Sequence, residues 1–238
     1  MSNGHWLSRV LGAIGLIVTV GISMNAQAGL SWKEEVLLHD GSKVIVERSV
    51  ERKGRHELGQ LPAYTRQTLA FINPNIGKAI TWEDKATEDF GTSNFLPIAL
   101  DIYQGTAYLV VTPMGCLSHN KWGRPNPPYV VFRHQGKGWE RVSLQELPLE
   151  TKALNLIASS PDTEVERLGK RMVDAESIKR INSEFRQPEY KSILRAALPK
   201  ERLDQMCEER VLYKGYWILP NDPVAQRMVD QRDKQGKQ

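Results

Sequence analysis

The chain has 238 residues, of which 40% are hydrophobic, and this is enough for one large domain or two small ones with a hydrophobic core. It carries 32 Lys and Arg residues against 28 Asp and Glu residues, a formal net charge of +4. So small an excess of positive charge does not indicate a nucleic-acid-binding protein, and we expect no nucleic acid among its partners.

Residues 1–28 have the pattern of a secretory signal peptide. Arg9 precedes an apolar stretch from Val10 to Ile22, and Ala26-Gln27-Ala28 provides a cleavage site after Ala28. As a helix the apolar stretch is about 20 Å long, too short for roughly 30 Å of bilayer hydrocarbon. We therefore predict a periplasmic or secreted protein that keeps no stable membrane span after cleavage. Cleavage removes Arg9 and no acidic residue, so the net charge falls from +4 to +3.

Residues 29–147 form a predicted β-rich body made of four strand pairs. Each pair is joined by a polar turn whose Gly, Asn, Asp or Pro residues suit the backbone angles of hairpins. The pairs are 34–40 with 43–50, 67–72 with 78–83, 95–103 with 106–112, and 129–134 with 139–144. About eight antiparallel strands in a hairpin meander predict a β-sandwich or a barrel. A propeller fits less well, because about 115 residues hold fewer than three blades.

Residues 148–225 form a predicted helical region packed on the β-rich body. Apolar residues recur at helical spacing in four short segments that begin near Ser160, Asp174, Pro188 and Pro199. Residues 211–219 are strand-like and are predicted to return to the sheet as a final edge strand. No linker separates the two halves, so we predict one α+β domain. The polar residues 226–238 are predicted to form a disordered tail.

The mature chain has two cysteines, Cys116 and Cys207. An even cysteine count in an exported protein predicts a disulfide, which would fix the predicted helix that carries Cys207 to the β-rich body. Two free thiols are the alternative.

The loop Thr112–Pro128 concentrates the residue types found in functional sites. Cys116 and His119 suggest a thiol nucleophile and its base. However, no orienting residue is marked, and a disulfide would consume the thiol. We therefore assign no catalytic residue to the loop.

Neither a metal site nor a cofactor site is predicted. His39, His56, His119 and His134 show no ligand spacing, and no CxxC, P-loop, GxGxxG or GxSxG motif occurs. The acidic pairs at 83–84 and 88–89 lack the calcium-loop pattern.

Aromatic and cationic residues alternate within and after this loop. Aromatic faces beside cations stack on sugar rings and hold anionic groups. The predicted ligand-binding residues are His119, Lys121, Trp122, Arg124, Arg133 and Trp139. The alternative is that both tryptophans belong to the core or a sheet edge and that the charges face water.

Two stretches carry a resemblance, WKEEVLLHDGSKVIVERS at 32–49 and NKWGRPNPPYVVFRHQGKGWERVSLQELP at 120–148. They resemble a group of exported bacterial proteins that have no assigned function. The resemblance implies export and transfers neither a catalytic residue nor a ligand.

Together these patterns predict an exported, non-enzymatic binding protein that uses the 112–128 loop. The predicted partner is an envelope protein or an anionic or glycan ligand. The alternative is a cell-envelope hydrolase of glycan or peptide that uses paired carboxylates, for example one that includes Asp101. The sequence does not determine the oligomeric state.

Overall fold

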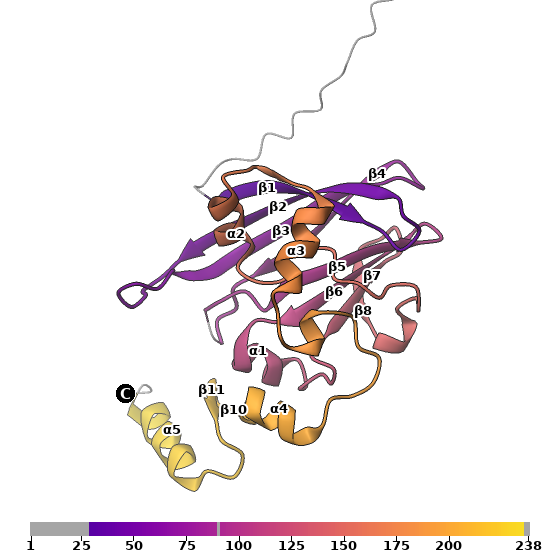
Figure 1. Cartoon of the computed structure of the whole chain (residues 1–238). Coiled ribbons are helices and arrows are strands. Elements are labelled where there is room, and N and C mark those ends of the chain that lie inside the picture. The colour runs from indigo at the N-terminus through magenta and orange to yellow at the C-terminus, as the bar shows by residue number, and fades with distance from the viewer. Residues whose placement is uncertain (1–28, 90, 236–238) are drawn as a thin grey trace, which may run out of the picture.

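The computed structural model describes residues 29–89 and 91–235 (Figure 1). The predicted signal peptide at 1–28 lies outside the described residues. Within the described part, no helix has both the length and the apolar composition needed to cross a membrane.

The first sheet is an antiparallel meander with one short parallel strand added. Its order is β4-β3-β2-β1-β9. The strands are β1 (Leu30–Leu37), β2 (Lys43–Lys53), β3 (Ala63–Asn73), β4 (Lys78–Lys85) and β9 (Met172–Val173). Val44, Val46 and Val50 are buried on one face together with Arg48, while Ile45, Glu47 and Ser49 are more exposed, as the alternation in the sequence predicts.

The second sheet is an antiparallel meander with the order β5-β6-β7-β8. Its strands are β5 (Phe95–Tyr103), β6 (Thr106–Pro113), β7 (Val130–His134) and β8 (Trp139–Val142), and helix α1 (Gly115–Lys121) lies between β6 and β7. Strand β5 is buried on both faces, which fits a sequence that is apolar except for Asp101.

The two sheets pack face to face and share the main hydrophobic core. Val46, Leu69 and Phe71 of the first sheet form one buried cluster with Leu100 and Leu109 of the second. Both sheets are open, so the predicted α+β fold is confirmed as a sandwich and not as a closed barrel.

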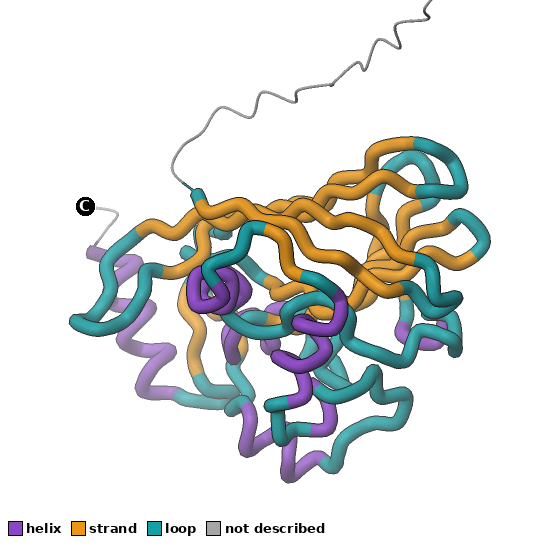
Figure 2. The backbone as a smooth tube through the Cα atoms, turned by 45° about the horizontal axis from the view of Figure 1, so that its top comes forward, coloured by secondary structure: helices purple, strands orange, loops and turns teal. Residues whose placement is uncertain are grey.

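Helices and loops gather on one side of the strands (Figure 2). The elements of this region are η1 (Leu144–Glu146), α2 (Pro161–Leu168), α3 (Ala175–Ser183) and η2 (Pro188–Tyr190). Helix α3 begins at Asp174, whose carboxylate accepts a hydrogen bond from the Ser177 N–H. Ile178 of α3 is buried with Trp32 and Val50 of the first sheet.

Residues 153–158 run between the two sheets without regular structure. The Asn155 amide donates to the carbonyls of Leu37 on β1 and Leu100 on β5, both at 2.8 Å. The Ile157 N–H donates to Glu34 at 3.0 Å, and Arg48 donates to the Ile157 carbonyl at 3.2 Å. Side chains thus supply hydrogen bonds that pairing with a neighbouring strand would otherwise provide. They satisfy backbone groups that burial would leave unpaired.

The C-terminal part of the chain differs from the prediction in two ways. It contains α4 (Lys200–Met206), β10 (Val211–Tyr213), β11 (Tyr216–Ile218) and α5 (Pro223–Gln235). The expected edge strand at 211–219 is instead a separate hairpin, which turns at Lys214-Gly215, where both φ angles are positive.

The predicted disordered tail at 226–238 is wrong for residues 226–235, which belong to α5. Asp222 accepts hydrogen bonds from the N–H groups of Val224 and Ala225, and Val229 is buried. The capped first turn and the buried Val229 stabilise this helix, although its polar composition alone predicts disorder.

Candidate functional site: the anchor loop and the C-terminal arm

The loop Thr112–Pro128, called here the anchor loop, is joined covalently to the end of the chain. Cys116 in α1 forms a disulfide with Cys207, which directly follows α4, and their Cα atoms are 5.1 Å apart. This is the pairing that the sequence predicts, and the Cα separation is normal for a disulfide. The bond spans a sequence separation of 91 residues and contributes about 4 to 5 kcal/mol in the chain-entropy model.

Polar side chains of the anchor loop bind the backbone of the C-terminal segment. Asn120 donates to the Glu208 carbonyl at 3.0 Å and accepts from the Arg210 N–H at 3.0 Å. Asn126 makes the same pair of contacts with Leu198, at 2.9 and 2.7 Å. The loop is therefore a binding surface for residues 198–210 of the same chain.

Arg124 also binds this C-terminal segment. Its guanidinium donates to the Cys207 carbonyl and to the Asp204 carboxylate, each at 3.0 Å. Lys200 and Arg124 together lower the pKa of Asp204, the Lys200 hydrogen bond being the larger cause. Most of the hydrogen-bonding capacity of Arg124 is thus directed at its own chain.

The two tryptophans of the predicted ligand-binding set are partly buried and pack against the main core, and Trp139 also links the two sheets. The Trp122 ring lies 4.5 Å from that of Phe95, and its indole N–H donates to Asn94 at 3.2 Å. The Trp139 N–H donates to the Thr81 carbonyl of β4 at 2.8 Å. These positions match the alternative in which the tryptophans belong to the core and a sheet edge.

His119 is buried, with 5% of its surface exposed, and its Nε2 atom has no hydrogen-bond partner among the described residues. Burial, with a smaller contribution from the positive charge of Arg124, lowers the pKa of His119 to about 4. The ring is therefore neutral near pH 7.

The remaining cations of the predicted set are paired within the fold. Lys121 lies 2.9 Å from Asp89, and Arg133 lies 2.9 Å from both Glu140 and Glu146. The structure brings His119, Lys121, Trp122 and Arg124 together around α1, whereas Arg133 and Trp139 lie on β7 and β8. Their binding of a ligand stays a prediction.

Asp101, which the sequence suggests for a paired-carboxylate hydrolase, binds other groups of the fold. Asp101 is buried, contacts His39 at 2.7 Å and accepts a hydrogen bond from Thr151, so it ties three segments together. Each of the four pockets that we describe is lined by a single carboxylate, and none by His119, Trp122 or Arg124. Over residues 29–89 and 91–235, no group of three or more His, Cys, Asp or Glu residues is suited to hold a metal ion.

The feature that sequence reasoning missed is the surface of the C-terminal arm, defined here as residues 207–235. Figure 1 shows the arm in yellow, beside α1 and away from the two sheets. Large apolar side chains on it are between 40% and 56% exposed: Val211, Leu212, Tyr216, Val224 and Met228. The apolar run VLYKGYWIL at 211–219 signals part of such a surface, although its strand-like pattern predicts an edge strand of the sheet.

The arm is folded on itself despite this exposure. Asp230 of α5 binds Lys214 at 2.6 Å and the Tyr213 hydroxyl at 3.1 Å, and Ile218 is buried. The arm carries five acidic and five basic residues, so its charges cancel. It therefore presents an ordered apolar surface without a dominant sign of charge.

No protein-family model, curated protein or solved structure matches this chain. Its function therefore has to follow from its own residues.

Proposed function

We propose that this chain is an exported, non-enzymatic interaction protein that binds a protein of the cell envelope through the apolar surface of its C-terminal arm. The observation that carries the proposal is the exposure of five large apolar side chains on an arm that a disulfide holds in place. Contiguous exposed apolar surface is typical of protein interaction sites, and Tyr and Met are enriched in them.

Export is supported by two independent features. Residues 1–28 have the signal-peptide pattern, and a disulfide persists in the oxidising compartments to which such peptides lead. In this proposal the anchor loop has a different role from the predicted one: it orients the arm that makes the contact.

The partner is expected to offer an apolar groove. Because the charges of the arm cancel, electrostatic attraction does not select an acidic or a basic partner. Binding that rests on apolar burial should persist at high salt, since screening acts on charges and not on apolar contacts.

Affinity capture from the envelope fraction tests the proposal. The bait is the exported protein, compared with its Leu212→Asp/Met228→Asp variant and with Leu58→Asp/Leu149→Asp, which adds the same charge at exposed leucines outside the arm. We expect the same protein to be captured by the wild type and the control variant, and to be reduced at least about tenfold by the arm variant. Equal capture by all three baits would contradict the proposal.

A second copy of this chain is a different occupant of the same surface, and sedimentation velocity distinguishes it. We expect a monomer in the absence of other proteins. A concentration-dependent dimer that the Leu212→Asp/Met228→Asp variant abolishes would replace the envelope partner by self-association.

A further inference from the structure

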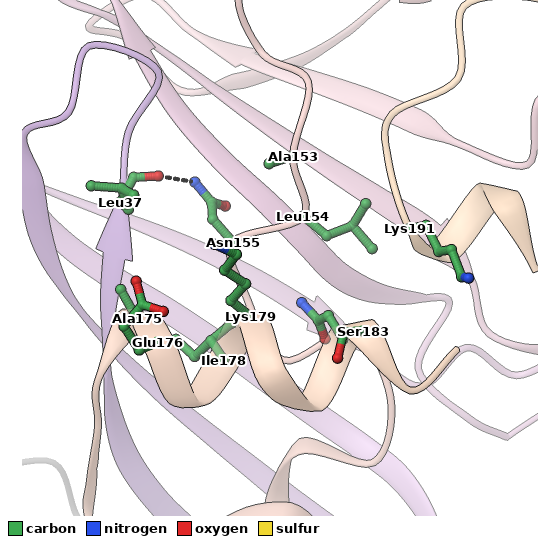
Figure 3. A pocket seen from close by; sticks show the side chains of 11 residues that line it. Leu37, Ala153, Leu154, Asn155, Ala175, Glu176, Ile178, Lys179, Ser183 and Lys191 are labelled. Atoms are coloured by element: carbon green, nitrogen blue, oxygen red, sulfur yellow. Dashed lines mark hydrogen bonds between the residues drawn. The ribbon is translucent and has the colours of Figure 1, made fainter. Parts of the chain in front are cut away.

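A pocket of about 540 Å³ lies between α3 and the sandwich (Figure 3). Small-molecule sites commonly have volumes of about 300 to 1,000 Å³. The lining residues come from the end of β1, from the 153–155 segment, from α3 and from the turn after η2.

The floor and walls of the pocket are apolar and fixed. Leu154 and Ile178 are buried, and the half-exposed Leu37 forms part of one wall. The two amides in the lining are already occupied: Asn155 binds β1 and β5, and Asn182 donates to the Leu156 carbonyl at 2.8 Å and accepts from the Ala158 N–H at 3.2 Å. These bonds hold the walls in shape and leave apolar surface for an occupant.

The rim carries an excess of positive charge. Lys179 of α3 and Lys191 after η2 are exposed lining residues, and neither has a hydrogen-bond or ion-pair partner among the described residues. The single carboxylate of the lining, Glu176, lies at the Leu37 end, whereas Lys191 lies at the opposite end beside Leu154 (Figure 3). The pocket is therefore electrically asymmetric along its length.

We propose that this pocket binds a small amphipathic anion, that is, an apolar body with one carboxylate or comparable acid group. The apolar body fits over Leu154 and Ile178, where burial removes its surface from water. The acid group meets Lys191 at the end away from Glu176, while Lys179 of α3 adds positive charge to the lining. This site is separate from the arm and does not depend on the role of the arm.

Two fluorescent probes that differ by one charge test the proposal. One is 8-anilinonaphthalene-1-sulfonate, and the other is N-phenyl-1-naphthylamine, which has the same rings without the sulfonate. Titrations use the exported protein carrying Leu212→Asp/Met228→Asp, so that the exposed apolar side chains of the arm do not bind the probes. We expect the anionic probe to bind more tightly than the neutral one.

Two further changes separate charge from shape. Lys179→Ala/Lys191→Ala is expected to weaken the anionic probe about three- to tenfold and to leave the neutral probe unchanged, as the loss of two exposed charge contacts predicts. Lys78→Ala/Lys234→Ala removes the same charge at exposed lysines outside the pocket and should change neither affinity. Ala153→Trp places an indole at the exposed edge of the pocket and should weaken both probes.

The proposal is overturned if the two probes bind with equal affinity to the protein whose pocket is unchanged. It is also overturned if Lys179→Ala/Lys191→Ala leaves the affinity for the anionic probe unchanged. It is also overturned if Ala153→Trp leaves both affinities unchanged, because the probes would then bind elsewhere. Thermal unfolding of each variant confirms that the fold is intact. Failure of partner capture by the arm would not alter any of these results.

Discussion

Residues 153–158 and the C-terminal arm differ both in regular structure and in burial. The first segment has no regular structure, yet most of it is buried and bound by side chains from β1, β2 and α3. The arm has two strands and a helix, yet it exposes large apolar side chains. Regular structure is thus no measure of integration into the core: the segment contributes to stability, and the arm is available for contacts with other molecules.

The disulfide joins the arm to the anchor loop, and its removal should have the largest effect. We expect Cys116→Ser/Cys207→Ser to lower the free energy of unfolding by about 4 to 5 kcal/mol, because the cross-link no longer restricts the unfolded chain. Urea denaturation measures this change.

Reductant provides the control for that change. It should lower the stability of the wild type to that of the double variant and leave the variant unaffected. Equal thiol alkylation of the exported protein with and without prior reduction, seen by mass spectrometry, would show that the bond does not form.

The buried segment is tested through Glu34. Its carboxylate binds Arg48 at 2.9 Å, the Trp32 indole at 2.7 Å and the Ile157 N–H at 3.0 Å, all in the core. Glu34→Ala leaves a buried guanidinium without its counter-charge and should cost about 3 to 5 kcal/mol in urea denaturation. Glu35→Ala removes a neighbouring, more exposed carboxylate and is the matched control, with an expected loss below about 1 kcal/mol. Similar losses for both would refute the assignment of Glu34.

The buried His119 should make the free energy of unfolding depend on pH. Its pKa of about 4 lies below the ordinary value of 6.5, so the folded protein disfavours the protonated ring. The associated stability is complete above pH 6.5 and is lost as the pH falls from 6.5 towards 4, by about 3 kcal/mol in total. Urea denaturation at pH 7 and pH 4.5 should show this loss in the wild type and not in His119→Gln. The same pH dependence in both proteins would mean that His119 does not titrate in this way.

Substitutions of exposed residues on the arm should change the stability of the protein little, unlike substitutions that affect residues 153–158. Leu212→Asp and Met228→Asp are expected to change the free energy of unfolding by no more than about 0.5 kcal/mol each, because both side chains are already largely in water. A loss above about 2 kcal/mol would show that these residues pack within the monomer.

The sheet body is predictable from the sequence because its determinants are local. The turns at Asp40-Gly41-Ser42 and Gln104-Gly105 lie where the structure has hairpins, and the valines of β2 face the core as their alternation predicts. The capping role of Asp174 is also visible in sequence. Each of these features depends on residues within a few positions of one another.

The rest depends on contacts between distant residues. Arg124 looks available for a ligand until Asp204 and Cys207, more than 75 positions away, are placed beside it. The burial of 153–158 depends on Glu34 and Asn182, and the helix at 226–235 on Asp222 and the Lys214–Asp230 pair. The disulfide is the exception, because compartment and cysteine count predict it without knowledge of geometry.

The most direct test of the arm as a partner-binding surface is photo-cross-linking in intact cells. A photoreactive residue replaces Leu212 on the arm or, as the control, the exposed Leu149 outside it. We predict that position 212 gives a discrete cross-linked product with one envelope protein, that position 149 does not, and that Met228→Asp reduces the product. The absence of a product specific to position 212, or an identical product from both positions, would contradict the proposed function.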